Sequence, residues 1–243
     1  MRIKNEKQNI DYNNTKAFFN RRANKYNASN PYSVTMYQDN DPELVNRRNS
    51  VETQKLIKLL NIDRNSRVLD LACGIGRWAD ALGERIHSYI GIDFSEDLIE
   101  IAQKRNKNPD VSFVVGSVTE LDSLLDKNST FNIILIIGAM MYLNDEDTIR
   151  TLEQVEKRCD SKARICIREP IGIESRLTLK DFYSKELDDN YNAIYRTRDE
   201  LIQLMIPNLL NKGFAVEEEG FLFDENRLNN RKETSQYYFI LNR

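Results

Sequence analysis

Residues 68–82 read "VLDLACGIGRWADAL", an apolar run that leads into a glycine-rich turn. Gly74, Gly76 and Ala79 fit the spacing G-x-G-x-x-[GA], and the turn lies between a predicted strand and a predicted helix. Glycines let a backbone bend tightly and approach a ligand closely, whatever that ligand is. The turn therefore predicts a nucleoside-binding loop, and its neighbours must identify the ligand.

Asp70 distinguishes between the candidate cofactors. It places a carboxylate at the end of a strand beside the loop, where a pyrophosphate is repelled and a cationic ligand is attracted. S-adenosylmethionine carries a sulfonium and an ammonium against one carboxylate, and it has no phosphate. Asp93 ends the next predicted strand, 19 residues after Gly74, where an acid can accept hydrogen bonds from ribose hydroxyls. The two acids favour S-adenosylmethionine over a nicotinamide dinucleotide.

Short apolar runs alternate with amphipathic helical patterns from residue 66 onward, which predicts a parallel sheet of βαβ units. The last two runs have no room for a crossover helix between them, so we expect them to pair as an antiparallel hairpin. The expected fold class is α/β: a Rossmann-like, seven-stranded, mostly parallel sheet with a C-terminal antiparallel hairpin and helices on both faces. The expected strands span residues 66–72, 87–93, 111–117, 131–138, 163–169, 214–223 and 234–243.

The ends of the expected sheet carry additional segments. Residues 1–49 show no strand signal, only helical stretches and a tyrosine-rich loop, and we expect an N-terminal helical cap or lid. Arg22 and Tyr26 are four residues apart and are expected to share a helical face there. Thr197 opens a helix that Pro207 is expected to kink and Gly213 to end.

The amino-acid composition narrows the classes of binding partner. The 243 residues include 35 basic and 38 acidic side chains, and a net charge of −3 disfavours nucleic acid and membrane surfaces as partners. Three cysteines without a CxxC pair predict free thiols in a reducing compartment and no metal site. No apolar run approaches the roughly 18 residues of a membrane span, and the N-terminus is too polar for a secretory signal. We expect a cytoplasmic protein with a small-molecule partner, and a homodimer stays open.

With these motifs, the sequence resembles the class I S-adenosylmethionine-dependent methyltransferases over about residues 50–243. "VLDLACGIGRW" is similar to the family's first motif, and "GIDFSEDLIEIAQKR" is similar to its second. The resemblance implies S-adenosylmethionine as cofactor, with Asp93 on the ribose and Phe94 beside the adenine. Ser117 stands where many members have an acid for the adenine amino group. The implied cofactor residues are Asp70, Ala72, Gly74, Gly76, Trp78, Asp93, Phe94, Gly116, Ser117, Val118, Ile137 and Gly138, with Tyr26 from the cap.

Other residues must bind and activate the methyl acceptor. Methyl transfer from a sulfonium is an in-line displacement, so positioning and desolvation supply most of the acceleration. The single histidine, His87, begins the second strand at the opposite edge of the sheet, which leaves Glu169 and Tyr195 as catalytic candidates. Family members commonly build acceptor pockets where this chain has a polar and aromatic insertion, at about residues 170–197. The expected acceptor-binding residues are Tyr32, Tyr37, Tyr142, Arg168 and Arg196.

The predicted function is therefore methyl transfer to oxygen or nitrogen of a small polar acceptor, with a sugar or a nucleotide-linked sugar as one candidate. Two alternatives stay open: a methyltransferase-like subunit that binds without catalysis, and an NAD-dependent oxidoreductase, against which Asp70 argues. The basic cluster Arg21, Arg22 and Lys25 keeps a protein or RNA acceptor open as well.

Overall fold

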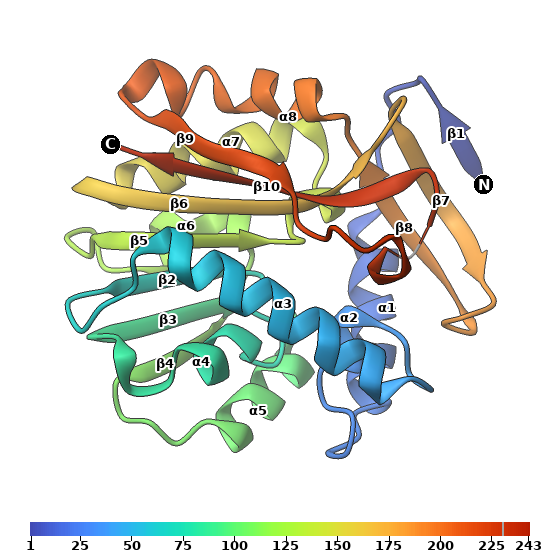
Figure 1. The fold of residues 1–243 in the computed structure, drawn as a ribbon, viewed down its shortest axis with the longest axis horizontal. Helices are drawn as coiled ribbons and strands as arrows, with labels where there is room; N and C mark the ends of the chain where they lie inside the picture. The colour runs from blue at the N-terminus through green and yellow to red at the C-terminus, as the bar shows by residue number, and fades with distance from the viewer. Residues whose placement is uncertain (230) are drawn as a thin grey trace.

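The computed structural model describes residues 1–229 and 231–243, in which a seven-stranded sheet has helices on both faces (Figure 1). Five neighbouring strands run parallel, and the last strand of the chain, Thr234–Asn242, pairs antiparallel with both of its neighbours. The predicted fold class is thus confirmed. From one edge to the other the strands are β4 (Val111–Val115), β3 (Ser88–Asp93), β2 (Arg67–Leu71), β5 (Phe131–Ile137), β6 (Cys159–Gly172), β10 (Thr234–Asn242) and β9 (Ala215–Phe221).

Alternation along the strands gives each face its own apolar core. Val68 of β2 joins a cluster with Leu56 and Trp78 from the helices on one face of the sheet, whereas Leu69 joins a cluster with Leu152 from a helix on the other face. Because both faces of the central strands are buried, their sequences are almost continuously apolar. The described helices are α1 (Tyr12–Asn24), α2 (Ser33–Met36), α3 (Pro42–Leu60), α4 (Arg77–Leu82), α5 (Glu96–Arg105), α6 (Leu121–Leu124), α7 (Asp145–Lys157) and α8 (Arg198–Met205).

A second, three-stranded sheet joins the insertion to the N-terminus, which corrects the expectation of no strand in residues 1–49. Its order is β1 (Arg2–Lys4), β7 (Leu177–Ser184) and β8 (Asp189–Tyr195), all antiparallel. A three-residue strand carries too little pattern to be recognised, because its pairing with β7 is a tertiary contact. Figure 1 shows this small sheet beside the ends of the main strands.

Two helix boundaries also differ from expectation. Thr197 opens α8 in a capping box with Glu200, but the helix ends at Met205, because Pro207 has no N–H with which to continue the hydrogen-bond ladder. Helix α1 ends at Asn24, so Tyr26 lies beyond it and shares no helical face with Arg22.

Helices α1 and α2 and the hairpin of β7 and β8, here called the cap, share one apolar cluster. Phe18 and Phe19 of α1 pack there with Tyr191 of β8, and burying each such side chain contributes about 1.5–3 kcal/mol. Helix α3 runs without interruption across the expected boundary at residue 49, so cap and sheet domain are joined by a rigid element. None of the helices in the described ranges is both long and apolar enough to span a bilayer.

Candidate active site

A cavity of about 390 Å³ lies where the carboxyl ends of the parallel strands meet the cap. The sheet domain contributes Asp70, Ala72 and Gly74 to its wall, and the cap contributes Phe19 and Tyr191. This is the edge at which open α/β sheets bind ligands, beside the point where strand order reverses between β2 and β5. The volume suits a nucleoside-sized molecule with a small partner.

The glycine-rich turn approaches the cavity with an unusual backbone. Ala72, Gly74 and Gly76 have φ angles of +60°, +57° and +77°, in the left-handed region that costs a residue with a Cβ about 1–2 kcal/mol. A Cβ on Gly74 would also meet Cγ2 of Thr35 at 2.7 Å, so this position needs glycine for space as well as for conformation. Strain retained at Ala72, in the cavity wall, is typical of a functional site.

Asp93, at the end of β3, is held by the turn itself. Its Oδ2 accepts a hydrogen bond from the backbone N–H of Gly74 at 2.9 Å, and its Oδ1 accepts one from Ser95 at 2.9 Å. Burial raises the pKa of this carboxyl to about 6, although the two N–H groups oppose the rise. Asp93 therefore orders the turn and presents the cavity with an acceptor for hydroxyl groups.

Asp70, in β2, is the more perturbed of the two acids. It is 1% exposed and accepts a hydrogen bond from the hydroxyl of Tyr89, and burial raises its pKa to about 7. The charge of Arg77 lowers this pKa, but no ion pair to Asp70 is formed among the described residues. A buried carboxylate in this state favours a cationic ligand, because ion pairing offsets its desolvation.

Most of the predicted residues line this cavity. Phe94 lies edge-on to Phe19, with ring centroids 5.8 Å apart, and the hydroxyl of Ser117 contacts that of Thr119 at 2.8 Å. The predicted residues in the wall are Asp70, Ala72, Gly74, Trp78, Asp93, Phe94, Ser117, Val118, Ile137, Gly138, Tyr37, Tyr142, Arg168 and Tyr195.

Four tyrosines, three from the cap and one from the turn after β5, form paired hydroxyl contacts in the wall. The hydroxyls of Tyr37 and Tyr142 contact each other, as do those of Tyr191 and Tyr195 at 3.3 Å. Burial raises the pKa of Tyr37 to about 12 and the pKa values of Tyr142 and Tyr195 well above 10. These three side chains are neutral at ordinary pH, so they can orient a ligand through hydrogen bonds.

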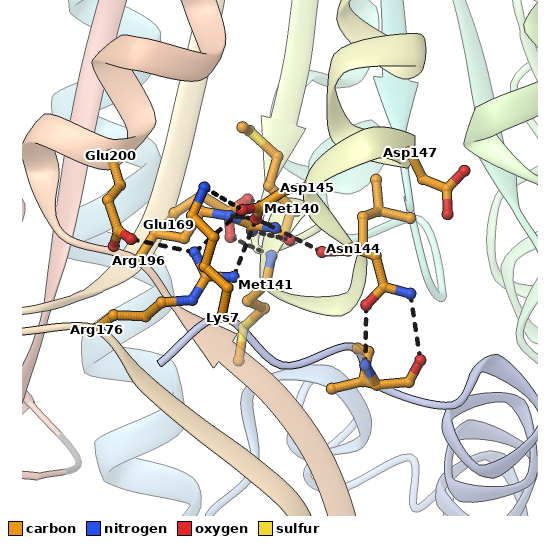
Figure 2. A network of polar contacts seen from close by, with 12 residues as sticks. Lys7, Met140, Met141, Asn144, Asp145, Asp147, Glu169, Arg176, Arg196 and Glu200 are labelled. Atoms are coloured by element: carbon orange, nitrogen blue, oxygen red, sulfur yellow. Dashed lines mark hydrogen bonds and ion pairs between the residues drawn. The ribbon is translucent and has the colours of Figure 1, made fainter. Parts of the chain in front are cut away.

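Glu169 and Arg196 lie outside the cavity wall and hold the turn after β5 (Figure 2). The Glu169 carboxylate accepts hydrogen bonds from three consecutive backbone N–H groups, Ala139 at 2.8 Å, Met140 at 2.9 Å and Met141 at 3.0 Å. Arg196 donates from Nη1 to the carbonyl of Met140 at 2.7 Å. The two residues therefore clamp a turn whose other side, including Tyr142, faces the cavity.

Four other predicted residues are not brought to the wall. Tyr32 donates to Asp80 at 3.2 Å, and Tyr26 accepts a hydrogen bond from Arg105. Gly76 and Gly116 serve packing, because a Cβ on them would meet Phe113 at 2.8 Å and a methyl carbon of Leu124 at 2.4 Å, respectively.

Sequence reasoning missed several charged residues of the wall, among them Glu52 and Arg231. Glu52 is 1% exposed and pairs with both Arg77 and Arg168, which lower its pKa overall although burial opposes them. The sequence signal for Glu52 was its position four residues after Arg48 on the predicted helix, which puts the two side chains on one helical face. Arg231 lies in a polar loop without periodicity, so the sequence held no signal for it.

Comparison with known proteins agrees with this geometry. Residues 68–161 match a family model described as a methyltransferase domain. Phosphoethanolamine N-methyltransferase 1 of Caenorhabditis elegans is 25% identical over 186 residues, which are 76% of this chain and 36% of that protein. The enzyme of the same name from Triticum aestivum is 27% identical over 120 residues, which are 49% of this chain and 24% of that protein. The chain thus spans about a quarter to a third of these relatives' length.

Solved structures share the fold at lower identity. Phosphoethanolamine N-methyltransferase 1 of Haemonchus contortus, in complex with phosphoethanolamine and S-adenosylhomocysteine, aligns with a TM-score of 0.72 and 19% identity over 93% of this chain and 47% of that one. A methyltransferase from Leishmania major aligns with a TM-score of 0.63 and 17% identity over 92% of this chain and 82% of that one. At such identities the likeness shows the fold.

Proposed function

The chain carries a methyltransferase domain of the class I, S-adenosylmethionine-dependent type, and on this premise we propose that it methylates a nitrogen or oxygen atom of a small polar acceptor beneath the cap. The pair of buried acids beside the glycine turn carries the proposal. Asp70 supplies the charge that the cofactor's ammonium group needs, and Asp93 supplies acceptors for the ribose hydroxyls. The two carboxylates repel a pyrophosphate placed against the glycine turn, which disfavours a dinucleotide in that position.

The acceptor site lies among the tyrosines. Tyr37, Tyr142, Tyr191 and Tyr195 form a wall of aromatic faces and hydroxyls, which suits a small polar molecule that must be oriented and desolvated. The relatives named phosphoethanolamine N-methyltransferases support nitrogen as the methylated atom. A sugar acceptor stays a prediction.

Glu169 and Tyr195 act in this proposal as positioning groups. Glu169 is committed to three backbone N–H groups, and the raised pKa of Tyr195 keeps its hydroxyl protonated. An amine that has lost its proton to solvent before it binds needs no base from the chain, because the sulfur of the cofactor leaves as a neutral thioether. Methyl transfer then depends on in-line alignment, which a fixed turn after β5 provides.

Incubation of the full chain with methyl-labelled S-adenosylmethionine tests the proposal. The acceptor panel should contain ethanolamine, phosphoethanolamine, a phenol and a nucleotide-linked sugar, with mass spectrometry of the products. We expect a methylated amine and stoichiometric S-adenosylhomocysteine. Cofactor binding without transfer to any amine or hydroxyl would instead support the non-catalytic subunit.

A further inference from the structure

Arg48 of α3 is a buried cation without a matching anion. It is 4% exposed and lines the cavity, and its Nε donates to the carbonyl of Leu228 at 2.8 Å. Its buried Nη1 has no hydrogen-bond partner among the described residues, and no ion pair to it is formed within them. Glu186 and Asp41 act on it only at longer range, and burial lowers its pKa. A guanidinium left in this state costs free energy until a ligand pairs with it.

Arg231 brings a second guanidinium to the same wall. Its Nη1 donates to the hydroxyl of Tyr195 at 2.9 Å, and its charge lies over the rings of Tyr191 and Tyr195 at 5.5 and 5.8 Å. Within the described ranges no carboxylate forms an ion pair with it. Leu228, whose carbonyl holds Arg48, precedes Arg231 by three residues in the segment between β9 and β10, so one short segment connects the two arginines.

The other arginines of the wall already have a carboxylate partner. Arg77 and Arg168 both pair with Glu52, and Arg168 also donates to Gln236 at 3.0 Å. Of the cavity's carboxylates, Asp70 and Asp93 lie in β2 and β3, Glu52 is paired with two arginines, and Glu186 lies between β7 and β8. The unpaired arginines come from α3 and from the segment before β10. The charge of the wall is therefore divided between a cofactor side and a second, basic side.

We propose that Arg48 and Arg231 form an anion subsite that binds a phosphate or carboxylate group of the methyl acceptor. The inference rests on the proposed function and names the acceptor class: a small molecule with a methylatable atom at one end and an anion at the other. Two guanidinium groups with free N–H donors match the oxygens of such an anion, and Tyr195 adds a hydroxyl. The anion would hold the acceptor by the end remote from the sulfonium, so the reacting atom points toward the cofactor.

Calorimetric titration of the full chain saturated with S-adenosylhomocysteine tests this subsite. The probes are O-phosphoethanolamine, β-alanine and ethanolamine, which share an amine and differ in their anion. We expect at least one of the two anionic probes to bind ten-fold or more tightly than ethanolamine, and their order distinguishes phosphate from carboxylate. Equal binding of all three probes would overturn the proposal.

Single substitutions test whether Arg48 and Arg231 bind the anionic group. Arg231→Met and Arg48→Lys should each weaken the preferred anionic probe about ten-fold, which is roughly 1.4 kcal/mol, and leave S-adenosylhomocysteine affinity unchanged. The matched control is Arg47→Met, because Arg47 precedes Arg48 on α3 and its side chain is 57% exposed in a pair with Glu225. Anion binding that falls equally in the control would contradict the assignment. Since Arg231 is only half-buried, its variant decides the question even if Arg48→Lys folds poorly.

The two proposals fail in different ways. If S-adenosylhomocysteine does not bind the wild-type chain, the methyltransferase proposal fails, and titration of the ligand-free chain with the anionic probes still reports on the arginines. If S-adenosylhomocysteine binds but ethanolamine is methylated as efficiently as the anionic probes, the subsite proposal alone is overturned.

Discussion

Cγ2 of Thr35 stands 2.7 Å from the point that a Cβ on Gly74 would occupy. Thr35 belongs to α2 in the cap, and Gly74 belongs to the turn that Asp93 holds, so the cap rests directly on the cofactor loop. One side of the proposed methyl-donor site is thereby built from residues about 40 positions earlier in the chain.

Gly74→Ala should weaken S-adenosylhomocysteine binding at least ten-fold in a calorimetric titration. The new methyl group meets Thr35, and the φ angle of +57° adds strain of about 1–2 kcal/mol. Gly213→Ala is the control, because Gly213 also has a positive φ, of +93°, and nothing lies within 4 Å of the position that its Cβ would take. Thr35→Ser should restore part of the lost affinity in the double variant. No rescue would show that the contact between cap and turn is unimportant.

Asp70→Asn should stabilise the ligand-free chain at pH 8 and weaken its cofactor binding. The folded pKa of about 7 lies above the ordinary value of 3.8, so the folded chain holds this proton more tightly than the unfolded chain does. Its contribution to stability is complete below about pH 4 and is lost as pH rises through 7. By pH 8 the free energy of unfolding of the wild-type chain has fallen by an amount on the order of 2–4 kcal/mol. The variant avoids this loss, so it should melt several degrees higher.

Melting curves between pH 5 and pH 8 check this, with the exposed Asp110→Asn as control. The increase in melting temperature that Asp70→Asn causes should grow with pH, whereas Asp110→Asn should show no such trend. Wild-type affinity for the cofactor should fall below pH 7, because protonation removes the charge that attracts the ammonium group. A gain in stability that is independent of pH would contradict the burial of an ionisable Asp70.

Glu169→Gln should lower the rate of methyl transfer through the turn after β5. The amide nitrogen would face backbone N–H groups that the carboxylate now satisfies, at a cost of about 1–3 kcal/mol in stability (Figure 2). The exposed Glu174→Gln is the control. If Glu169 positions the turn, the pH–rate profile keeps its shape while the rate falls. Loss of the acidic limb of that profile would identify Glu169 as a general base instead.

Tyr37→Phe should reduce methyl transfer more than cofactor binding. It removes a buried hydroxyl that contacts Tyr142 in the cavity wall and keeps the ring that packs on Phe18. We expect a three- to ten-fold loss in kcat/KM, since a hydrogen bond is worth about 0.5–1.5 kcal/mol. Tyr183→Phe, at an exposed tyrosine outside the cavity, is the control. Equal effects of the two variants would argue against an acceptor site at Tyr37.

The sequence was most informative where local pattern and tertiary structure agree. The parallel strands, their alternation and the turn at Gly74 follow from periodicity and glycine spacing, and the buried acids follow from their places at strand ends. Glu169 was expected at the cleft for the same reason, yet its carboxylate turns to the backbone of residues 139–141. The position of a residue in a strand predicts where its backbone lies, but not which of several nearby groups its side chain contacts.

The acceptor side was harder to predict because it depends on long-range contacts. Arg196 was expected to bind the acceptor, but it donates to carbonyls of the turn after β5, while Arg231 from a loop without periodicity reaches the wall. The β1–β7 pairing brings the first residues of the chain against the insertion, and no local pattern encodes such a contact.

Calorimetric titration of the full chain with S-adenosylhomocysteine, and separately with NAD, decides whether the acids beside the glycine turn form a methyl-donor site. We expect one S-adenosylhomocysteine to bind per chain, NAD not to bind, and Asp93→Asn to weaken S-adenosylhomocysteine binding at least ten-fold. Binding of NAD without S-adenosylhomocysteine, or an affinity for S-adenosylhomocysteine that Asp93→Asn leaves unchanged, would show that these acids do not hold the cofactor.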